Sequence, residues 1–303
     1  MAASTLTKTH DSRRWHVLGA GSIGSLFAAY LQRANTPVSL LPRQLTDSGQ
    51  RTIDKGPVSG QYSFDISLPS ETDPINFLLV TTKAYDVYAA LQSIQHRLQP
   101  ESAIILLVNG MGFQAELAAL NQPGKIYFAT TTEGAFRSDT NNLTHAGSGV
   151  TRVGCQGEPP TEWFADWPNA IPNCQWDDDI DAALWLKLAI NCAINPLTAL
   201  ENCLNGELGE SPELRDRVAT LCAEIATVAQ AAGHQAVAKG LQQQVFEVIR
   251  GTSNNRSSML QDHSAGRRTE IDYLTGYLVK LAETLEIAVP ENRQLLLEIK
   301  AHE

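Results

Sequence analysis

The sequence predicts an α/β domain with a mainly parallel sheet, followed by an all-α domain. Short apolar runs alternate with helical patterns from Trp15 to about Cys174, and a glycine-rich turn follows the first of these runs. Beyond about residue 179 nearly every segment has only the helical spacing of apolar residues. Strands that alternate with helices are typical of a parallel sheet covered on both faces. We therefore expect an α/β domain over 15–178 and a helical domain over 179–303, preceded by a disordered polar leader over 1–14.

The first domain contains five apolar runs that have the length of strands. They are WHVL (15–18), PVSLL (37–41), INFLLVTT (75–82), AIILLV (103–108) and KIYFATT (125–131). Helical spacing separates them over 23–34 and about 85–98. This order predicts a series of β-α-β units.

The second domain contains longer helical patterns. The acidic stretch QWDDDIDAAL (175–184) suits a connector or a helix start, and helices are predicted over 213–232, 238–250 and 270–287. The last of these has a buried face formed by Ile271, Leu274, Leu278, Leu281 and Leu285. Pro196 and Pro290 are expected to interrupt the series of helices.

Composition excludes several classes of protein. Among 303 residues, 43% are apolar and 18% charged, and the formal charge of −10 argues against general binding to nucleic acid or to an anionic membrane. Five dispersed cysteines without a CxxC pair predict buried thiols, with neither a disulfide framework nor a metal site. No signal peptide or membrane span is predicted, so we expect a cytoplasmic protein.

The turn GAGSIG, residues 19–24, carries the strongest functional motif. Gly19, Gly21 and Gly24 have the GxGxxG spacing between a strand and a helix. The first glycine permits a tight turn, the second lets a diphosphate approach the backbone, and the third allows the helix to pack closely on the strand. The peptide groups of Ala20, Ser22 and Ile23 complete the turn at the helix N-terminus, which favours anions. This context predicts a Rossmann-type dinucleotide site.

The end of the second strand indicates which dinucleotide binds. An NAD site usually has an acid about 20 residues after the glycine motif. This chain instead has Arg43 there, with no acid along the sequence until Asp47. A guanidinium suits the 2′-phosphate of NADP, so we expect NADPH/NADP+ as cofactor. An ordinary surface arginine is the alternative.

The segment WLKLAINCAINP, residues 185–196, combines an apolar helix with three polar side chains at steps of four. Lys187, Asn191 and Asn195 therefore lie on one narrow face. A solvated stripe would explain this pattern. Asparagine is nevertheless a poor helix former when water is its only partner, which favours a functional role.

These motifs together resemble the ketopantoate reductase (2-dehydropantoate 2-reductase) family. The similarity runs from about Trp15 to Ile299 and rests on GAGSIG, VTTKAYD, NGMG, LWLKLAINCAINPLTALENCLNGEL, SSMLQD and RRTEIDYLTGYLV. The resemblance implies a Rossmann domain, an all-α domain and an active site in the cleft between them. It also implies reduction of 2-dehydropantoate to (R)-pantoate with NADPH, on the route to pantothenate and coenzyme A.

The resemblance also implies roles for single residues. Lys187 matches the general acid and Glu270 an active-site carboxylate that also meets the cofactor. Substrate contacts are implied for Lys187 and for six further residues: Asn109, Asn191, Asn195, Asn205, Asn255 and Ser258. Cofactor contacts beyond the glycine turn are implied for Arg43, Lys83, Asn109, the backbone near Ala135, and Glu270.

Structural interpretations stand beside several of these roles. Glu270 could be an acid in the first turn of a helix, and Ser258, with Gln261 three residues on, could be a helix N-cap. Asn109 could be a turn residue, whereas Lys83 follows a strand end, where open α/β sheets bind ligands. Glu133 departs from the family pattern, and its carboxylate must point away from the cofactor phosphates or meet Arg137.

Three functions remain open from the sequence. The first is an NADPH-dependent reductase of 2-dehydropantoate, acting as a monomer or homodimer. The second keeps the architecture but acts on another 2-keto acid or hydroxyacid. The third is a non-catalytic NADPH sensor, which would need none of the polar residues of the implied substrate site.

Overall fold

The chain divides into two compact units, which a computed structural model describes over residues 13–43, 46–155 and 162–303. The sheet unit contains the described residues up to 82, 86–108 and 119–178. The helical unit contains 83–85, 109–118 and 179–303. Two short segments that follow strands in sequence thus belong to the helical unit. Of the predicted leader, residues 1–12 lie outside the described residues, and Arg14 forms an ion pair with Asp65 at 2.6 Å.

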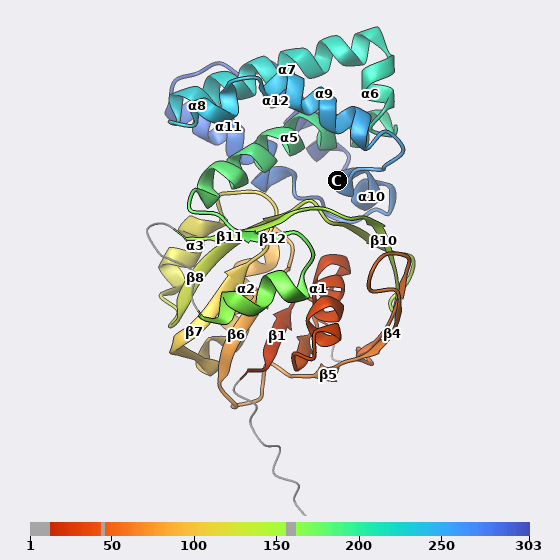
Figure 1. Ribbon diagram of the computed structural model, residues 1–303. Helices are drawn as coiled ribbons and strands as arrows, with labels where there is room; N and C mark the ends of the chain where they lie inside the picture. Colours follow the sequence, from red (N-terminus) through yellow and green to blue (C-terminus); the bar gives the residue numbers. More distant parts are fainter. Residues whose placement is uncertain (1–12, 44–45, 156–161) are drawn as a thin grey trace, which may run out of the picture. The chain divides into compact units, whose positions relative to one another are not determined.

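The larger sheet has eight strands and forms the centre of the sheet unit (Figure 1). In spatial order they are β12 (Cys174–Trp176), β11 (Thr151–Gly154), β8 (Lys125–Thr131), β7 (Leu98–Leu106), β6 (Ile75–Val80), β1 (Trp15–Leu18), β2 (Val38–Leu41) and β5 (Asp65–Ile66). All neighbours are parallel except β11 and β8, which are antiparallel. The predicted parallel sheet is confirmed, and strands of four to nine residues occupy the predicted apolar runs.

A second sheet of four strands was not expected from the sequence. Its order is β4 (Gly60–Ser63), β3 (Gln50–Asp54), β10 (Asn142–Gly147) and β9 (Gly134–Arg137). These strands are short and carry many exposed polar residues. They therefore lack the apolar alternation that identifies a strand in sequence.

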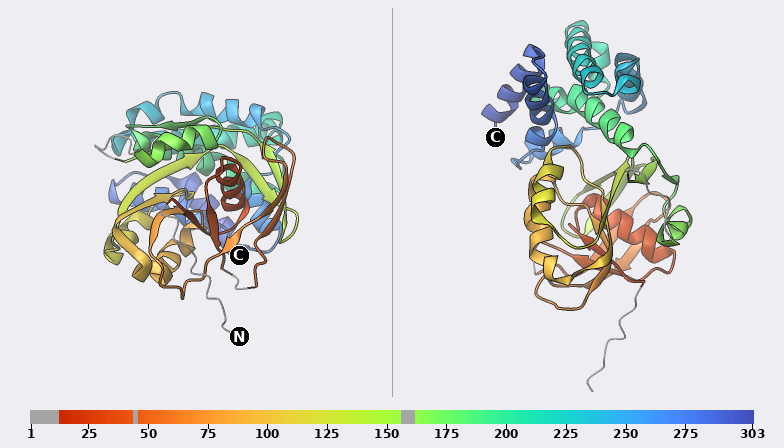
Figure 2. Two further views of the ribbon diagram at one scale, coloured as in Figure 1. Left: turned by 60° about the horizontal axis from the view of Figure 1, so that its bottom comes forward. Right: turned by 90° about the vertical axis from the view of Figure 1, so that its left-hand side faces the viewer.

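Helix α1 (Ser22–Arg33) is the main buried helix of the sheet unit. It packs on β1 and β2 of the larger sheet and on β9 of the smaller one, so it is enclosed between the two sheets (Figure 2). Eight of its twelve residues are buried. Further helical segments of this unit are α2 (Val87–Ile94), η2 (Gln95–Arg97), η3 (Glu162–Asp166) and α4 (Trp167–Ala170). The helix predicted over 85–98 is therefore shorter than expected.

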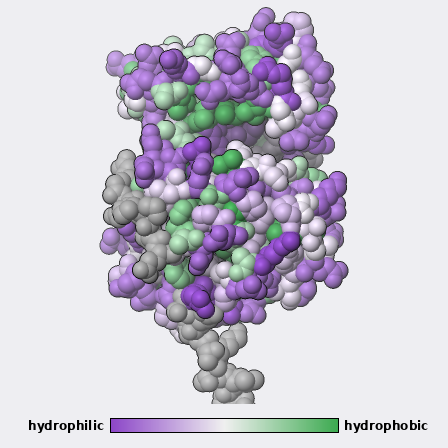
Figure 3. Space-filling model, viewed as in Figure 1, coloured by the Kyte–Doolittle hydropathy of each residue, from purple (hydrophilic) through white to green (hydrophobic). Residues whose placement is uncertain are grey.

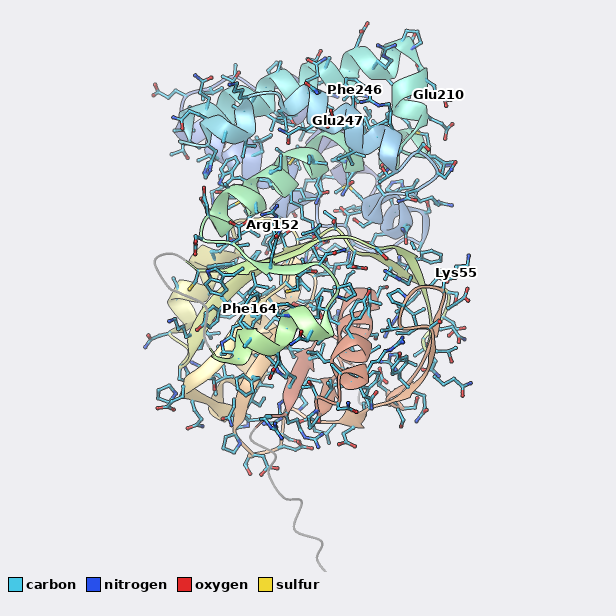
Figure 4. The ribbon with its side chains drawn as sticks, viewed as in Figure 1. Lys55, Arg152, Phe164, Glu210, Phe246 and Glu247 are labelled. Atoms are coloured by element: carbon cyan, nitrogen blue, oxygen red, sulfur yellow. The ribbon has the colours of Figure 1, made fainter. Side chains whose placement is uncertain are left out.

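Aromatic residues extend the core of the sheet unit beyond the sheet itself. Trp15 stacks on Phe77 with ring centroids 5.2 Å apart and also contacts Trp163 and Trp167. Phe164, labelled in Figure 4, contacts Trp163 edge-on. Such aromatic pairs contribute beyond their buried area, so η3 and α4 are held firmly on the sheet.

The helical unit is built around α5 (Ile180–Glu201), which packs against α7, α9, α10 and α12. Its other helical segments are α6 (Glu207–Glu210), α7 (Pro212–Ala231), α8 (Gln235–Ala238), α9 (Leu241–Gly251), α10 (Ser258–Ser264), η4 (Ile271–Tyr273), α11 (Thr275–Thr284) and α12 (Pro290–Ala301). The segments η1 (Ala84–Asp86) and α3 (Phe113–Leu120) contain residues of both units.

Helix α5 is long and apolar enough to cross a membrane by length and composition, but 61% of the tested stretch is buried inside the protein. Its packing against α7, α8, α9, α10 and α12 explains this composition as that of a core helix. Asp179 caps it by accepting a hydrogen bond from the backbone N–H of Ala182. The acidic stretch is thus a helix start, as predicted.

Two expectations about helix ends are wrong. Pro196 lies inside α5 and does not interrupt it. Pro290 begins α12 and separates it from α11, as expected. The helix predicted over 270–287 is divided at Leu274 into η4 and α11.

On the face in Figure 3, hydrophilic residues predominate and apolar residues form separate patches.

Candidate functional site

The glycine turn between β1 and α1 has the geometry that its motif predicts. Gly19 has a φ of +95°, and a Cβ there would lie 2.7 Å from the backbone nitrogen of Thr82. A Cβ on Gly24 would overlap the Gly19 carbonyl and the Thr81 hydroxyl. At Gly21 the nearest atom would be 4.0 Å away, so the backbone is open there. Close packing thus requires the first and third glycines, and the second leaves room for a ligand.

The N-terminus of α1 suits an anion. No side chain caps it, and its first turn contains no acidic residue. The free N–H groups and the positive end of the helix dipole therefore remain available to a phosphate. Together with the open face at Gly21, this local chemistry fits the diphosphate of a dinucleotide.

Two arginines that sequence reasoning did not assign to the site support this turn. Arg137 on β9 donates a hydrogen bond to the Ala20 carbonyl. Arg51 on β3 is buried and donates to the Ser25 hydroxyl at 3.0 Å and to both carboxylate oxygens of Asp47 at 2.9 and 2.7 Å. Although burial raises the pKa of Asp47, hydrogen bonds from Arg51 and the Gly49 N–H hold it below its usual range. The second sheet thus brings positive charge to α1.

Glu133 points away from the glycine turn. Its carboxylate is buried, lies 2.5 Å from Nε2 of His145 and accepts a hydrogen bond from the Gly149 N–H at 3.0 Å. The first of the two expectations for this residue is confirmed, and no ion pair with Arg137 is found among the described residues. Ala135, two residues on, lies on β9 opposite His145 of β10.

Arg43 lies beyond the carboxyl end of β2 and is exposed, with 85% of its side chain accessible. Its guanidinium is 3.3 Å from the carboxylate of Asp86. The sequence places no acid close to Arg43, but the fold brings one from 43 positions away. No pattern in the local sequence could have predicted this ion pair.

A compact charged cluster forms in the helical unit around Glu270. Lys83 Nζ lies 2.7 Å from Asp262 and 3.2 Å from Glu270, and the N–H of Ala84 donates to Glu270 at 3.0 Å. Both carboxylates are nearly inaccessible to solvent. Glu270 precedes η4 and its side chain caps nothing, so its interpretation as a first-turn acid is wrong. Asp262, within the motif SSMLQD, was not predicted.

This cluster determines the charge of Lys83. Burial by itself lowers the pKa of its ammonium group, but the carboxylates of Glu270 and Asp262 overcome that effect. The pKa of Lys83 is therefore raised well above its usual range. Lys83 remains a cation at every pH at which the protein would work.

Lys187 lies on α5 and is half-buried, as is Asn191, and Asn195 is buried. None of the three is fully exposed, which favours a functional role over a solvated stripe. Burial lowers the pKa of Lys187 to about 8, although the charge of Glu270 raises it. An ammonium group with this pKa can release its proton near neutral pH.

The remaining predicted residues lie in two places of the helical unit. The backbone N–H of Asn205 donates to the Asn255 carbonyl at 3.0 Å, and its side chain donates to Thr252 at 2.9 Å. Asn109 begins a loop in which the Met111 N–H donates to the Tyr273 carbonyl at 2.8 Å, three residues from Glu270. The structure thus brings Asn205 and Asn255 together and attaches the Asn109 loop beside η4.

Ser258 is not the N-cap of α10. Ser257 caps that helix, because its hydroxyl accepts a hydrogen bond from the Leu260 N–H at 3.0 Å and another from Thr198 at 2.7 Å. Ser258 is exposed in the first turn. The Ser258–Gln261 spacing resembles a capping box, but burial of the preceding serine against α5 decides which hydroxyl caps.

No group of His, Cys, Asp or Glu that could hold a metal occurs among residues 13–43, 46–155 and 162–303. All five cysteines are free thiols, and four are buried. Burial raises the pKa of Cys192 to about 12, so this thiol beside the polar face of α5 is unreactive.

Comparison with known proteins shows the family of this chain. Residues 15–158 match the family described as ketopantoate reductase PanE/ApbA, and residues 179–303 match its C-terminal counterpart. The chain is 38% identical to a 2-dehydropantoate 2-reductase of Yersinia pestis, over 95% of this chain and 94% of that protein.

Solved structures show the same fold. A 2-dehydropantoate 2-reductase from Geobacter metallireducens has a TM-score of 0.85 at 22% identity, over 96% of this chain and all of the other. A D-mandelate dehydrogenase with NADH and anilino(oxo)acetate has a TM-score of 0.83 at 22% identity, over 95% and 97% of the two chains. With both of its parts matched, the chain belongs to the ketopantoate reductase family.

Proposed function

We propose that this protein reduces 2-dehydropantoate to (R)-pantoate with NADPH. The observation that carries the proposal is the state of Lys187, whose pKa of about 8 suits a proton donor at neutral pH. Family membership and the 38% identity to a protein named 2-dehydropantoate 2-reductase support the choice of substrate.

Reduction of a ketone converts a neutral carbonyl oxygen into an alkoxide, which must receive a proton. NADPH, when bound, supplies the hydride. Lys187 donates a hydrogen bond to the carbonyl oxygen, stabilises the charge that develops there and delivers the proton. A positioned general acid contributes about 10²- to 10⁴-fold to the rate. Because α5 is the core helix of its unit, the lysine is held without a loop that must first be ordered.

Glu270 keeps enough positive charge on Lys187 for this role. Its carboxylate raises the pKa of Lys187 against the effect of burial. It is itself held by Lys83 and by the Ala84 N–H, so its position does not depend on the substrate. Glu270 therefore acts on the reaction through Lys187.

The polar residues of the helical unit would hold the substrate. Asn191 and Asn195 follow Lys187 on one face of α5, and their amides can donate to or accept from the terminal hydroxyl without adding charge. Asn109, Asn205, Asn255 and Ser258 are the further candidates. The exposed Ser258 hydroxyl and the first N–H groups of α10 offer donors for the carboxylate.

The glycine turn and several residues of the family pattern are the candidates for holding the cofactor. The turn from Gly19 to Gly24 and the N-terminus of α1 offer N–H groups for the diphosphate. Arg43 offers a guanidinium for a 2′-phosphate. Lys83, Asn109, Glu270 and the backbone at Ala135 are assigned to the same cofactor from the family pattern. We place the protein in the cytoplasm, as a monomer or homodimer, with its domain boundary between 178 and 179.

A steady-state assay with 2-dehydropantoate and each reduced nicotinamide cofactor tests this function. We expect turnover with NADPH and weaker use of NADH, because a charge-assisted bond to Arg43 contributes ~1.5–3 kcal/mol, or about 10- to 100-fold. The Arg43→Ala variant should lose affinity for NADPH and keep its affinity for NADH. Absence of turnover with either cofactor would overturn the proposal.

The analogue 2-keto-3,3-dimethylbutyrate tests whether the asparagines recognise the terminal hydroxyl of the substrate. It has the methyl groups but lacks the hydroxyl, so buried amides would be left without a partner. We expect kcat/KM to fall about 10²-fold, taking ~1–3 kcal/mol for the stranded groups. This discrimination should shrink in Asn191→Ala or Asn195→Ala, and equal use of both ketones by the parent enzyme would contradict the substrate assignment.

A second candidate keeps the chemistry and changes the substrate. It is favoured by the fold shared with a D-mandelate dehydrogenase solved with anilino(oxo)acetate. A panel of 2-keto acids with aromatic and branched side chains distinguishes the two candidates. Higher kcat/KM for an aryl keto acid than for 2-dehydropantoate would favour the second.

A further inference from the structure

The contact between Arg43 and Asp86 joins two loops on either side of the glycine turn. Strand β1 pairs in parallel with β2 on one side and with β6 on the other. The glycine turn follows β1, Arg43 follows β2, and Asp86 follows β6. Because parallel strands end at the same edge, the two side chains approach each other from strands about 10 Å apart, which flank the strand that leads into the turn.

Each member of this pair suits a different cofactor. In this fold the end of the second strand faces the ribose 2′ position of the adenosine. A carboxylate there accepts a hydrogen bond from the 2′-hydroxyl of NADH, and a guanidinium binds the 2′-phosphate of NADPH. The chain presents both groups at 3.3 Å from each other, one from each neighbouring loop.

The Arg43–Asp86 ion pair would also weaken the binding of NADPH. The Asp86 carboxylate neutralises the guanidinium that the phosphate needs, and it repels the phosphate itself. Both groups are accessible to solvent, Arg43 by 85% and Asp86 by 35%. The pair can therefore be separated at low cost, because an exposed ion pair contributes no more than ~1 kcal/mol.

We propose that Asp86 sets the cofactor specificity of this enzyme by opposing the preference that Arg43 confers for NADPH over NADH. The inference rests on the proposed function and adds a residue to it. It assigns Asp86 a direct role at the adenosine end of the cofactor site, where the 2′-phosphate must displace it from Arg43. The enzyme is thereby less selective for NADPH than its arginine alone would make it.

Calorimetric titration of the resting protein with NADP+ and NAD+ tests this inference without turnover. Asp86→Asn should tighten NADP+ binding about 3- to 5-fold, which corresponds to the strength of an exposed pair. Its affinity for NAD+ should stay the same or weaken. The gain for NADP+ should fade at high salt, since the charges are exposed and screened.

Smaller probes and a matched control locate the effect. Adenosine 2′,5′-bisphosphate should show the same gain as NADP+, and AMP should show none. The control variant Asp65→Asn also removes one negative charge from the sheet unit. Asp65 pairs with Arg14, which precedes β1. This ion pair therefore lies at the opposite end of β1 from the glycine turn. This control should leave both affinities unchanged. In an Arg43→Gln background, the gain from Asp86→Asn should shrink.

Two results would overturn the inference in different ways. If the parent protein binds NADP+ and Asp86→Asn leaves the ratio of the two affinities unchanged, Asp86 does not set specificity and the proposed function stands. If the parent protein binds neither dinucleotide, the proposed function fails and this inference fails with it.

Discussion

Lys83 and Lys187 both lie in the helical unit and both respond to the charge of Glu270, yet their pKa values are shifted in opposite directions. Burial lowers the pKa of each ammonium group. Around Lys83 two carboxylates in direct contact overcome this effect and raise the pKa. Around Lys187 burial prevails, and the pKa falls to about 8.

The difference shows that one carboxylate can support two roles. Its contact with Lys83 makes a permanent ion pair that fixes the carboxylate, and its weaker effect on Lys187 keeps that lysine close to half-protonated in mildly alkaline solution. A lysine that never loses its proton can only bind and orient. A lysine near its pKa can also donate the proton. Family membership alone would not explain why the pKa values of the two lysines differ.

The largest expected effect comes from removing the titrating lysine. We expect Lys187→Ala to lower kcat by about 10²-fold or more with the fold retained, because the general acid is lost. Affinity for NADPH should survive, since Lys187 is not among the residues assigned to the cofactor. Retention of most of the activity would show that Lys187 does not donate the proton.

The pH dependence of the parent enzyme comes next. Reduction requires the ammonium form of Lys187, so kcat should fall as pH rises through about 8, by about tenfold for each further unit. Oxidation of pantoate requires the neutral amine and should rise over the same interval. A rate of reduction that stays flat to pH 10 would contradict a pKa of about 8 for the acid.

Removing the shared carboxylate should produce a smaller effect. In Glu270→Gln the carboxylate that raises the pKa of Lys187 is lost, so this pKa should fall further and the pH profile of reduction should move to lower pH. A shift of about half a unit to one unit lowers kcat at pH 8 by roughly 2- to 6-fold, because the parent lysine is itself about half protonated there. Glu283→Gln is the matched control, because Glu283 is exposed and pairs with Arg293 on the surface. A profile that moves to higher pH would be inconsistent with this account.

The smallest effect on catalysis is expected for Asp262→Asn. Asp262 contacts Lys83 and Arg267, but its charge is not among the causes of the Lys187 shift. The pH profile should therefore keep its position and kcat should change by about threefold or less. The midpoint of thermal unfolding should fall, because Lys83 and Arg267 lose a buried partner. Movement of the pH profile would mean that the two lysines are coupled through Asp262.

Several features follow from the sequence alone. Strands β1, β2, β6, β7 and β8 were predicted because each contains a short apolar run, and a helix over 185–196 was predicted from the helical spacing of its polar and apolar residues. The glycine turn was predicted because its three glycines serve contacts within one β-α unit. Lys187, Asn191 and Asn195 were placed on one face because helical spacing fixes that relation.

Other features were decided only by the tertiary structure. The second sheet was missed because its strands are short and polar, and their stability comes from pairing across the chain and from packing on α1. Ser257 caps α10 in place of Ser258 because it is buried beside Thr198 of α5. Segments 83–85 and 109–118 belong to the helical unit although their neighbours in sequence form the sheet.

The charged contacts also combine residues that the sequence predicted with partners that only the tertiary structure supplied. The sequence supplied Lys83, Glu270, Lys187 and Arg43, but it could not show that Asp262 would share Lys83 or that Asp86 would meet Arg43. These partners are 179 and 43 positions apart. A pKa depends on burial and on the charges within a few ångströms, and neither quantity is encoded by local spacing. The sequence therefore determined which groups can do the chemistry, and the folded chain decided which of two lysines is able to release a proton.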